Sequence, residues 1–498
     1  MRQVVSLPDS RGELVANRIS AKGQNGAFAL YSSKRKRHWD ASAEVQRAFP
    51  TLSKYYHARL AAIYRNLIPE GAKVLELGCG CGDLLASLKP SYGVGIDFSP
   101  KILDKARAKY PGLTFIEADV HEFALDGPFD FIILSDLVND LWDVQTVFGR
   151  IGLVSSPGTR IIINFYSHLW ELPLRAAQHL GAATRTMPQN WLTVEDLTHL
   201  IFLADLEAIR HFAEFLWPFP TIGLATLFNR YLVKLWPFRY FALTNFIVAR
   251  PAPAELPAPE PSVSVIVPAR NEAGNIRGIL ERTPEMGSRT ELIFVEGNSG
   301  DGTYEVIEKL LPEYPGCNGR LFRQTGRGKG DAVRLGFSEA TGDILMILDA
   351  DMTVFPEDLP RFCEAIASGK GEFINGVRLV YPMEKQAMRF LNLAGNKFFS
   401  LAFSWLLGQS IKDTLCGTKV LWRKDYFRIA NNRAYFGEFD PFGDFDLLFG
   451  AAKLNLKIVE LPVRYGERTY GTTNIRRFSH GFMLLKMVAF AARKIKFT

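Results

Sequence analysis

VLELGCGCGDLL, at residues 74–85, is an apolar run followed by closely spaced glycines and a second apolar stretch, which predicts a strand, a tight turn and a helix. Gly78, Gly80 and Gly82 stand at alternate positions, and glycine lets a backbone turn sharply and approach a ligand with no side chain in between. Dinucleotide-binding folds carry a different spacing, G-x-G-x-x-G. The stretch therefore predicts an α/β domain that holds a small molecule at the end of its first strand.

Similar strand-like runs alternate with amphipathic stretches along the rest of the chain, which predicts the α/β class with two doubly wound domains. Strands are expected at residues 73–78, 92–97, 113–118, 129–134 and 160–165, and then at 262–269, 291–297, 343–350 and 457–463. The predicted organisation is a basic extension over 1–39, a first domain over 40–250, a linker over 251–261 and a second domain with a basic amphipathic tail over 262–498. Five of the eleven linker residues are proline, which excludes a helix or a central strand there.

The composition is that of a folded globular protein. Of the 498 residues, 47% are hydrophobic and 22% are charged, which excludes collagen-like and disordered chains. Five cysteines are too few for a disulfide framework, so we expect a reducing, cytoplasmic compartment. Because no stretch of 18 uninterrupted apolar residues occurs, no membrane-spanning helix is expected.

The net charge of +7 is concentrated near one end of the chain. Residues 464–498 carry eight Lys or Arg and one Glu, whereas the rest is balanced. Such an end favours a phosphate-bearing partner, either a substrate or an anionic membrane surface, and a solvated basic helix is the alternative. A second basic cluster, residues 34–37, is expected to be solvated surface, and no nucleic-acid partner is expected.

Acidic residues close two of the strands that follow the glycine turn. Asp97 ends the second predicted strand and Asp119 ends the third. A carboxylate at the carboxyl edge of a parallel sheet can accept hydrogen bonds from ribose hydroxyls or from an adenine amine. With the glycine turn, these acids resemble the class I S-adenosylmethionine-dependent methyltransferases over about residues 55–250. A dehydrogenase-like nucleotide domain is the alternative, but the glycine spacing differs and the acid comes too early for it.

This resemblance implies S-adenosylmethionine as the cofactor. It places the glycine loop around the methionine part, supported by a buried acid, and two further acids at the ribose and adenine: Gly78, Gly80, Gly82, Glu76, Asp97, and Asp119 with Val120. The methyl acceptor is not indicated, and an acceptor in the same glycan or lipid-linked pathway as the second half is a hypothesis. A cofactor-binding or scaffolding module without turnover is the alternative.

Polar residues follow the fourth predicted strand, where members of this family often contact the methyl acceptor: Asp136, Asn139, Asp140 and Asp143. Each of them could equally cap or solvate a helix.

In the second half, polar groups again follow predicted strands. Residues 268–272 are PARNE, residues 296–303 are EGNSGDGT, and the run ILMIL leads into Asp349-Ala350-Asp351. Two carboxylates separated by one residue suit Mg²⁺ or Mn²⁺, because these ions prefer oxygen ligands and bridge few carboxylates to substrate phosphates. The triplet alone is a weak signal. Its place after V-P-x-x-N-E and G-K-G-x-A-x-R-x-G makes a metal-diphosphate site the prediction.

This half resembles the family 2 glycosyltransferases of the GT-A fold, and RYGERTYGTTN, residues 464–474, is similar to the polyprenyl-phosphate sugar transferases of the dolichyl-phosphate mannosyltransferase type. The resemblance implies a UDP- or GDP-linked sugar donor and gives the metal to Asp349 and Asp351. It places these residues at the nucleotide sugar: Pro268, Arg270, Asn271, Glu272, Glu296, Asn298, Lys329, Arg334 and Asp349. Glu296-Gly297 stands where the family usually has paired aspartates, which leaves the nucleobase open.

The implied reaction is inverting sugar transfer to a polyprenyl phosphate or a glycan acceptor. A lipid phosphate is ionised at pH 7 and needs no strong base, and arginines of the basic end would hold it: Arg464, Arg468 and Arg476. A hydroxyl acceptor would need a base, for which Asp444 or Asp446 is the candidate. The predicted catalytic residues are Asp351, Asp444, Arg464 and Arg468.

Membrane contact is a further expectation. Residues 389–408 have the apolar body, aromatic residues and basic edge of an interfacial helix, and a core helix with a buried aromatic face is the equal alternative. Residues 480–496 could add a second amphipathic contact. Since no spanning helix is expected, we expect the protein to be peripheral on the cytoplasmic face of a membrane, and a processive polysaccharide synthase is disfavoured.

Overall fold

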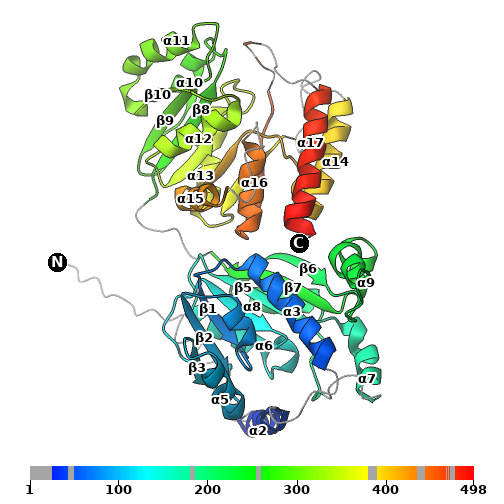
Figure 1. Ribbon diagram of the computed structural model, residues 1–498. Helices are drawn as coiled ribbons and strands as arrows, with labels where there is room; N and C mark the ends of the chain where they lie inside the picture. The colour runs from blue at the N-terminus through cyan, green and yellow to red at the C-terminus, as the bar shows by residue number, and fades with distance from the viewer. Residues whose placement is uncertain are drawn as a thin grey trace, which may run out of the picture. The chain divides into compact units, whose positions relative to one another are not determined.

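The computed structural model describes residues 25–42, 50–179, 186–253, 260–378, 390–433, 443–466, 468, 470–471 and 477–497. It divides into two compact units, Met1–Ala252 and Pro253–Thr498 (Figure 1).

The first unit is built on a seven-stranded mixed sheet with the order β3-β2-β1-β4-β5-β7-β6. Neighbours from β3 to β5 are parallel, whereas β7 is antiparallel to both β5 and β6. The strands are β1 (Lys73–Leu77), β2 (Tyr92–Asp97), β3 (Thr114–Glu117), β4 (Phe131–Ser135), β5 (Arg160–Tyr166), β6 (Leu206–Glu214) and β7 (Thr244–Pro251). The helices are α2 (Asn25–Ser42), α3 (Pro50–Leu67), α4 (Asp83–Ser87), α5 (Pro100–Lys109), α6 (Val144–Leu153), α7 (Glu171–His179), α8 (Val194–Leu203) and α9 (Leu224–Thr226), with short turns η1 (Val138–Asp140), η2 (His168–Trp170), η3 (Leu227–Tyr231), η4 (Leu232–Lys234) and η5 (Phe238–Phe241).

Helices cover both faces of this sheet. Buried residues of α3, α4 and α5 pack with one set of strand residues, and those of α6 and α8 pack with the other. The central strands β1, β4 and β5 are accordingly buried over most of their length, as parallel strands between helical layers are. Polar loops are thereby confined to the strand ends.

The second unit has a mixed sheet of seven strands in the order β10-β9-β8-β11-β13-β12-β14, in which β13 is antiparallel to its neighbours. The strands are β8 (Val263–Ala269), β9 (Thr290–Glu296), β10 (Arg320–Arg323), β11 (Ile344–Ile347), β12 (Phe373–Val377), β13 (Lys419–Trp422) and β14 (Ile458–Pro462). The helices are α10 (Ile276–Arg282), α11 (Thr303–Leu310), α12 (Lys329–Glu339), α13 (Leu359–Ala367), α14 (Phe390–Leu407), α15 (Arg423–Asn431), α16 (Asp444–Lys453) and α17 (Arg477–Ala491), with turns η6 (Leu311–Glu313), η7 (Pro315–Cys317), η8 (Pro356–Asp358) and η10 (Ala492–Lys496).

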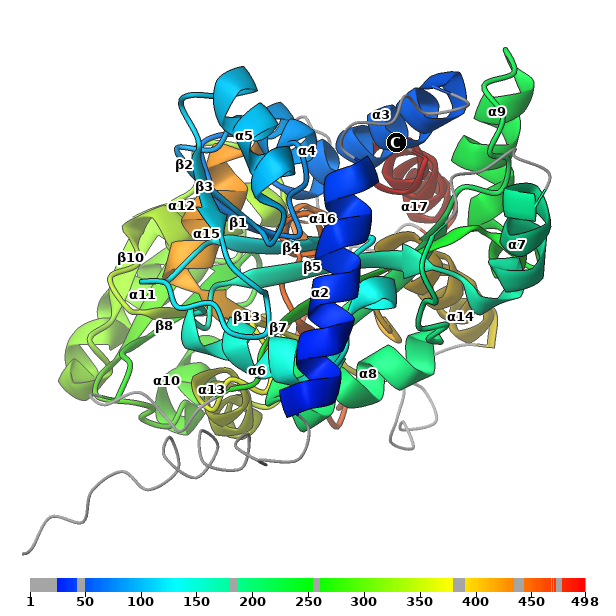
Figure 2. The ribbon, with the colours of Figure 1, turned by 90° about the horizontal axis from the view of Figure 1, so that it is seen from below.

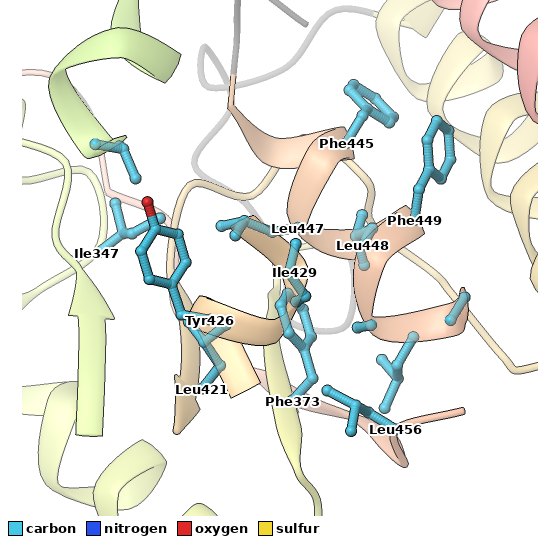
Figure 3. Packing of buried hydrophobic residues seen from close by; sticks show 14 of the residues in the cluster. Ile347, Phe373, Leu421, Tyr426, Ile429, Phe445, Leu447, Leu448, Phe449 and Leu456 are labelled. Atoms are coloured by element: carbon cyan, nitrogen blue, oxygen red, sulfur yellow. The ribbon is translucent and has the colours of Figure 1, made fainter. Parts of the chain in front are cut away.

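The second unit has a large apolar core on one side of its sheet. Figure 3 shows Phe373 and Leu421, from the strands β12 and β13, beside Tyr426 and Ile429 of α15, with Leu448 of α16 nearby. Helices α10, α11 and α13 pack on the other side. The carboxyl ends of β8, β9 and β11 are therefore held at one edge by cores on both sides of the sheet.

The α/β class predicted for both halves is confirmed, and each of the nine expected strands overlaps an observed one. Strands β6, β7, β10, β12 and β13 are not predicted from the sequence. Two of these, β7 and β13, are the antiparallel strands, and β7 extends to Pro251, the first residue of the expected linker. A proline is tolerated there because the pairing of β7 with β5 ends at Ala249, so Pro251 has a strand partner on one side only.

Residues 390–407 form α14, which packs beside α17 (Figure 1). Phe403 and Leu407 are buried with Met487 in the core, as the core-helix alternative expects. Phe398 and Leu401 are exposed, so interfacial contact through this second face stays a prediction. None of the helices within the described ranges is both long and apolar enough to cross a bilayer.

Candidate functional sites

The glycine turn of the first unit connects β1 to α4. Gly78, Gly80 and Gly82 have φ angles of 69°, 51° and 74°, in the left-handed region that other residues rarely adopt. A Cβ atom on Gly78 would also lie 2.8 Å from Cδ1 of Leu137, which follows β4. The turn therefore requires glycine and lies against the loop after β4.

Glu76 is buried beneath this turn. Its Oε2 accepts a hydrogen bond from the backbone N–H of Leu85 at 3.1 Å, which joins β1 to α4. Burial raises the pKa of Glu76 to about 8, although the Leu85 hydrogen bond acts in the opposite direction. The side chain lies where a residue supporting the loop would lie, and the role remains a prediction.

Asp97 lies beside the glycine turn. Its Oδ2 accepts from the N–H of Gly80 and its Oδ1 from the N–H of Ser99, both at 3.0 Å. Burial raises the pKa of Asp97, against the effect of these hydrogen bonds. A ribose would therefore share the carboxylate with the loop.

Asp119 lies two residues after the end of β3, the strand that pairs with β2. It accepts hydrogen bonds from the ring Nδ1 of His121 at 2.6 Å and from the backbone N–H of His121 at 3.0 Å. Burial would raise its pKa, but these hydrogen bonds outweigh burial and lower it. The side chain of Val120 is buried in the core. An adenine amine would have to share Asp119 with His121.

Helix α2 crosses the carboxyl ends of the first sheet (Figure 2). Its Ser32 donates to Asp119 Oδ2 at 2.9 Å, and its Lys36 donates to Glu117 at 2.8 Å. Arg35 is buried, pairs with Asp140 at 3.0 Å and donates to the carbonyl of Pro188 at 2.6 Å. The expectation that residues 34–37 are solvated surface is therefore wrong for Arg35, because the helix turns this one cation inward onto Asp140.

Asp136 lies directly after β4, with a positive φ of 54°. Tyr56 of α3 donates to both of its carboxylate oxygens, at 2.9 and 3.0 Å, and Asn164 of β5 donates to Oδ1 at 2.5 Å. Burial raises the pKa of Asp136 to about 7, although these hydrogen bonds lower it. A strained backbone and a carboxyl that titrates near neutrality are features of functional sites.

The other three residues that were expected to contact the methyl acceptor have partners within the fold. Asn139 accepts from the N–H of Tyr166 at 3.0 Å, Asp140 pairs with Arg35, and Asp143 caps α6 by accepting from the N–H of Thr146 at 3.1 Å. Of the four residues expected near the methyl acceptor, Asp136 is therefore the one that the geometry favours.

In the second unit, hydrogen bonds join the polar loop after β8 to the polar loop after β9. Asn271 has a positive φ of 57°, and its Oδ1 accepts from the N–H of Gly300 at 2.9 Å. Buried Glu296 accepts from the N–H of Ser299, and Asn298 donates to the carbonyl of Gln324 at 3.4 Å. Pro268 is half-buried in β8, and Arg270 is exposed just after it.

The two acids of the D-x-D triplet are both paired with cations. Lys329, the first residue of α12, lies 2.5 Å from Asp349 Oδ1. Arg468 donates to Asp351 Oδ2 at 2.9 Å and to Glu272 Oε1 at 3.0 Å. Burial would raise the pKa of Asp349, but Lys329 outweighs burial and lowers it, so the carboxylate is ionised. Arg468 thereby joins the loop after β8, the triplet and the segment after β14.

The donor set suits a hard divalent cation, because Asp349 and Asp351 offer carboxylate oxygens on one loop and Mg²⁺ commonly takes one or two carboxylates plus substrate phosphates. Within the described ranges, no group of three or more His, Cys, Asp or Glu side chains is arranged to bind a metal ion. A metal would therefore depend on the donor phosphates for its remaining ligands.

The structure adds residues that the sequence analysis does not single out. A Cβ atom on Gly417 would lie 1.9 Å from Asp349 Oδ2, so only glycine allows this approach. Lys419 is completely buried in β13, and Arg378 pairs with buried Asp413 at 2.7 Å; Lys419 and Arg378 both lower the pKa of Asp349. Lysine in a buried apolar strand is the signal that could have identified this segment.

Of the remaining predicted residues, Arg334 contacts a different acid. Arg334 of α12 and Asp446 of α16 approach to 3.8 Å and both line a small pocket between these two helices. Arg464 is exposed. Asp444 begins α16, but its side chain lies outside the described part of the structure, as does Arg476.

Two families match parts of the chain. Residues 68–206 match a family described as a methyltransferase domain, and residues 264–440 match glycosyl transferase family 2. The dolichol-phosphate mannosyltransferase of Saccharomyces cerevisiae is 42% identical over 109 residues, which are 21% of this chain and 40% of that protein. The protein of the same name from Pyrococcus furiosus is 28% identical over 248 residues, 47% of this chain and 67% of its own length.

A crystal structure of an S-adenosylmethionine-dependent methyltransferase from Mesorhizobium loti is 21% identical, with a TM-score of 0.31, and the match covers 38% of this chain and 96% of that one. The chain spans 40% of the length of the yeast relative, and the methyltransferase match lies wholly outside the segment that the glycosyl transferase family matches.

Proposed function

We propose that this chain, in which a methyltransferase domain precedes a family 2 glycosyltransferase domain resembling the dolichol-phosphate mannosyltransferases, has two activities. The second unit transfers a sugar from a nucleotide sugar to a polyprenyl phosphate. The first unit transfers a methyl group from S-adenosylmethionine to a separate acceptor. The proposed sugar transfer rests on one observation: at the ends of β8 and β11, Asp349 pairs with Lys329 and Asp351 pairs with Arg468.

The charges of this cluster suit a nucleoside diphosphate. Lys329 and Arg468 offer donors that can leave their carboxylates for phosphate oxygens, and Arg468 can bind one with both arms of its guanidinium. A bound Mg²⁺ or Mn²⁺ on Asp349 and Asp351 would supply further positive charge where the diphosphate leaves. Glu272 then keeps Arg468 oriented, since it lies 3.0 Å away.

An acceptor phosphate fits the basic segment after β14. A phosphate monoester is mostly dianionic at neutral pH, so it can attack without a strong general base. Arg464 is exposed four residues before Arg468, on the same segment that reaches the triplet. This supports a phosphate acceptor over a hydroxyl acceptor, for which Asp444 remains the candidate base.

A transfer assay tests the proposal. The intact protein is incubated with Mg²⁺ or Mn²⁺, a panel of radiolabelled UDP- and GDP-sugars, and polyprenyl phosphate, and the organic phase is counted. Label in the organic phase supports the lipid acceptor and identifies the donor. Donor hydrolysis with no lipid product would favour a hydroxyl acceptor and contradict the proposed one.

For the first unit, we propose that Asp136 accepts a proton from the methyl acceptor. It follows β4 beside Leu137, which lies against Gly78 of the cofactor loop. Its pKa of about 7 lets it act as a base near neutral pH. Calorimetry with S-adenosylmethionine followed by a turnover assay separates this activity from a module that binds the cofactor without turnover.

A further inference from the structure

The segment between β6 and β7 carries apolar side chains that neither candidate site uses. Ile222 is fully exposed, and Trp236 and Phe241 are 75% and 59% exposed. Of its other exposed apolar side chains, three are about half exposed: Phe219, Leu227 and Tyr240. We call these six residues the apolar platform. Proteins that remain monomeric in water rarely gather so much exposed apolar surface without a binding role.

The platform is held firmly by the fold. Asn229 is buried, and its Oδ1 accepts from the N–H groups of Leu216 and Trp217 at 2.8 and 2.7 Å. Its Nδ2 donates to the hydroxyl of Tyr55 on α3 at 2.9 Å. Lys234, also buried, pairs with Glu214 at the end of β6. These polar anchors keep the apolar side chains pointing outward while the backbone of the segment is fixed.

The charge of this segment has one sign. No Asp or Glu occurs between Glu214 and Glu255, whereas Arg230 and Arg239 are exposed among the platform residues. The guanidinium of Arg239 lies 4.9 Å from the centroid of the Tyr240 ring. Basic residues interleaved with Trp and Tyr complement an anionic lipid surface, because the rings occupy the headgroup boundary and the cations meet phosphates.

We infer that the apolar platform docks the first unit on an anionic lipid bilayer, with Ile222 and Trp236 inserted into the acyl boundary and Arg230 and Arg239 at the headgroups. Side chains that protrude as far as Ile222 suit a fluid medium that closes around them. This inference concerns the methyltransferase unit and does not depend on sugar transfer.

Docking by the platform has a consequence for the methyl acceptor. Phe215, at the start of the segment, lies with its ring 4.7 Å from that of Tyr56, which donates to Asp136. The segment that carries the platform therefore begins beside the candidate methyl-transfer site. An acceptor carried in the bilayer would reach Asp136 from this side.

The test uses the intact chain with vesicles of phosphatidylcholine alone or with an equal amount of phosphatidylglycerol. Amide hydrogen exchange measured by mass spectrometry should show protection of residues 219–241 on the anionic vesicles. This readout is local, so binding through the second unit does not obscure it. Binding to vesicles with unchanged exchange at 219–241 would overturn the inference.

Variants sharpen the test. The double variant Ile222→Asp/Trp236→Asp should lose the protection and lower the bound fraction in flotation about tenfold or more. Phe202→Asp is the matched control, because Phe202 on α8 is 75% exposed, as Trp236 is, but lies outside the platform. Arg230→Gln/Arg239→Gln should weaken binding to anionic vesicles and reduce its salt dependence, and it leaves the apolar residues intact. All of these side chains are exposed, so circular dichroism should show unchanged folding.

The alternative occupant is a second copy of the chain. Light scattering that shows a dimer which Ile222→Asp/Trp236→Asp dissociates, with no vesicle protection of residues 219–241, would assign the platform to self-association and overturn the bilayer docking.

Discussion

Asp136 and Glu76 are two acids of the first unit, of which Asp136 is half-buried and Glu76 is fully buried, and their settings differ. Asp136 has three hydrogen-bond contacts from side chains of α3 and β5 and lies at a strand end, whereas Glu76 lies beneath the glycine turn with a backbone partner. Both have raised pKa values because of burial. The first setting suits proton transfer and the second suits a structural link.

Replacing Asp136 with Asn should reduce methyl transfer about 10²–10⁴-fold, because a general base contributes about that much. In the native protein the rate should rise with pH and level off above about 7, since the base must be ionised and its pKa is about 7. The measurement is a pH–rate profile with S-adenosylmethionine at saturation. Asp143→Asn is the matched control, because Asn also caps a helix well. An unchanged rate in Asp136→Asn would remove Asp136 from the mechanism.

Glu76 should make stability depend on pH in a predictable direction. Its pKa rises from 4.5 to about 8 on folding, so the folded state favours the protonated form. The contribution of Glu76 to the free energy of unfolding is therefore fully present below pH 4.5 and is lost as the pH rises toward 8. Glu76→Gln keeps an acceptor for the Leu85 N–H without the charge. The free energy of unfolding of this variant, measured with denaturant, should increase relative to that of the native protein by a few kcal/mol between pH 5 and pH 8.

Glu122→Gln, at an exposed position, is the control for this experiment. A stability difference between Glu76→Gln and the native protein that stays constant with pH would contradict the raised pKa.

At the scale of elements, α2 is bound to two of the loops that follow strands at the proposed cofactor site. Arg35 on α2 pairs with Asp140 after β4, and Ser32 meets Asp119 after β3. Since the helix bridges two strand ends, its detachment would uncover the acids expected to hold the adenosine.

Arg35→Ala should loosen α2 without unfolding the sheet. Removing one member of a buried ion pair costs about 3 kcal/mol, which corresponds to about hundredfold faster amide exchange in residues 25–42. Hydrogen exchange measured by mass spectrometry on the cofactor-free protein tests this. Lys34→Ala, at an exposed position of the same helix, should leave exchange unchanged. Equal exchange in the two variants would show that the Arg35 pair does not hold the helix.

Whether an element can be predicted from the sequence depends on whether local pattern or long-range packing places it. The glycine turn, Asp97, Asp119 and the D-x-D triplet stand next to apolar runs long enough to predict strands, so short-range pattern locates them. Strand β13 is only four residues long and antiparallel, so apart from Lys419 in its apolar run the local sequence gives little sign of it. The approach of Gly417 to Asp349 depends on strands far apart in sequence, and the inward turn of Arg35 depends on where Asp140 lies. Such long-range packing is what the sequence analysis misses.

At the scale of the molecule, the two units have separate cores, so we expect that each of the two proposed activities can be removed without the other. Asp351→Ala should abolish sugar transfer, because it removes a proposed metal ligand and the partner of Arg468, while calorimetry should show unchanged S-adenosylmethionine binding. Asp358→Ala, in the same unit and paired with Arg361, is the control and should keep transfer. Retained transfer in Asp351→Ala would refute the role given to this residue.

The pairing of Lys329 with Asp349 and of Arg468 with Asp351 and Glu272 has a consequence for substrate entry. The proposed donor site already contains its counterions, so the arrival of an anionic donor would resemble ion exchange: Lys329 and Arg468 would turn to the donor phosphates, and Asp349 and Asp351 would then be able to hold a divalent cation. Such an exchange leaves the net charge of the surroundings nearly unchanged. Departure of the nucleotide would reverse it and restore the same resting pairs for the next donor.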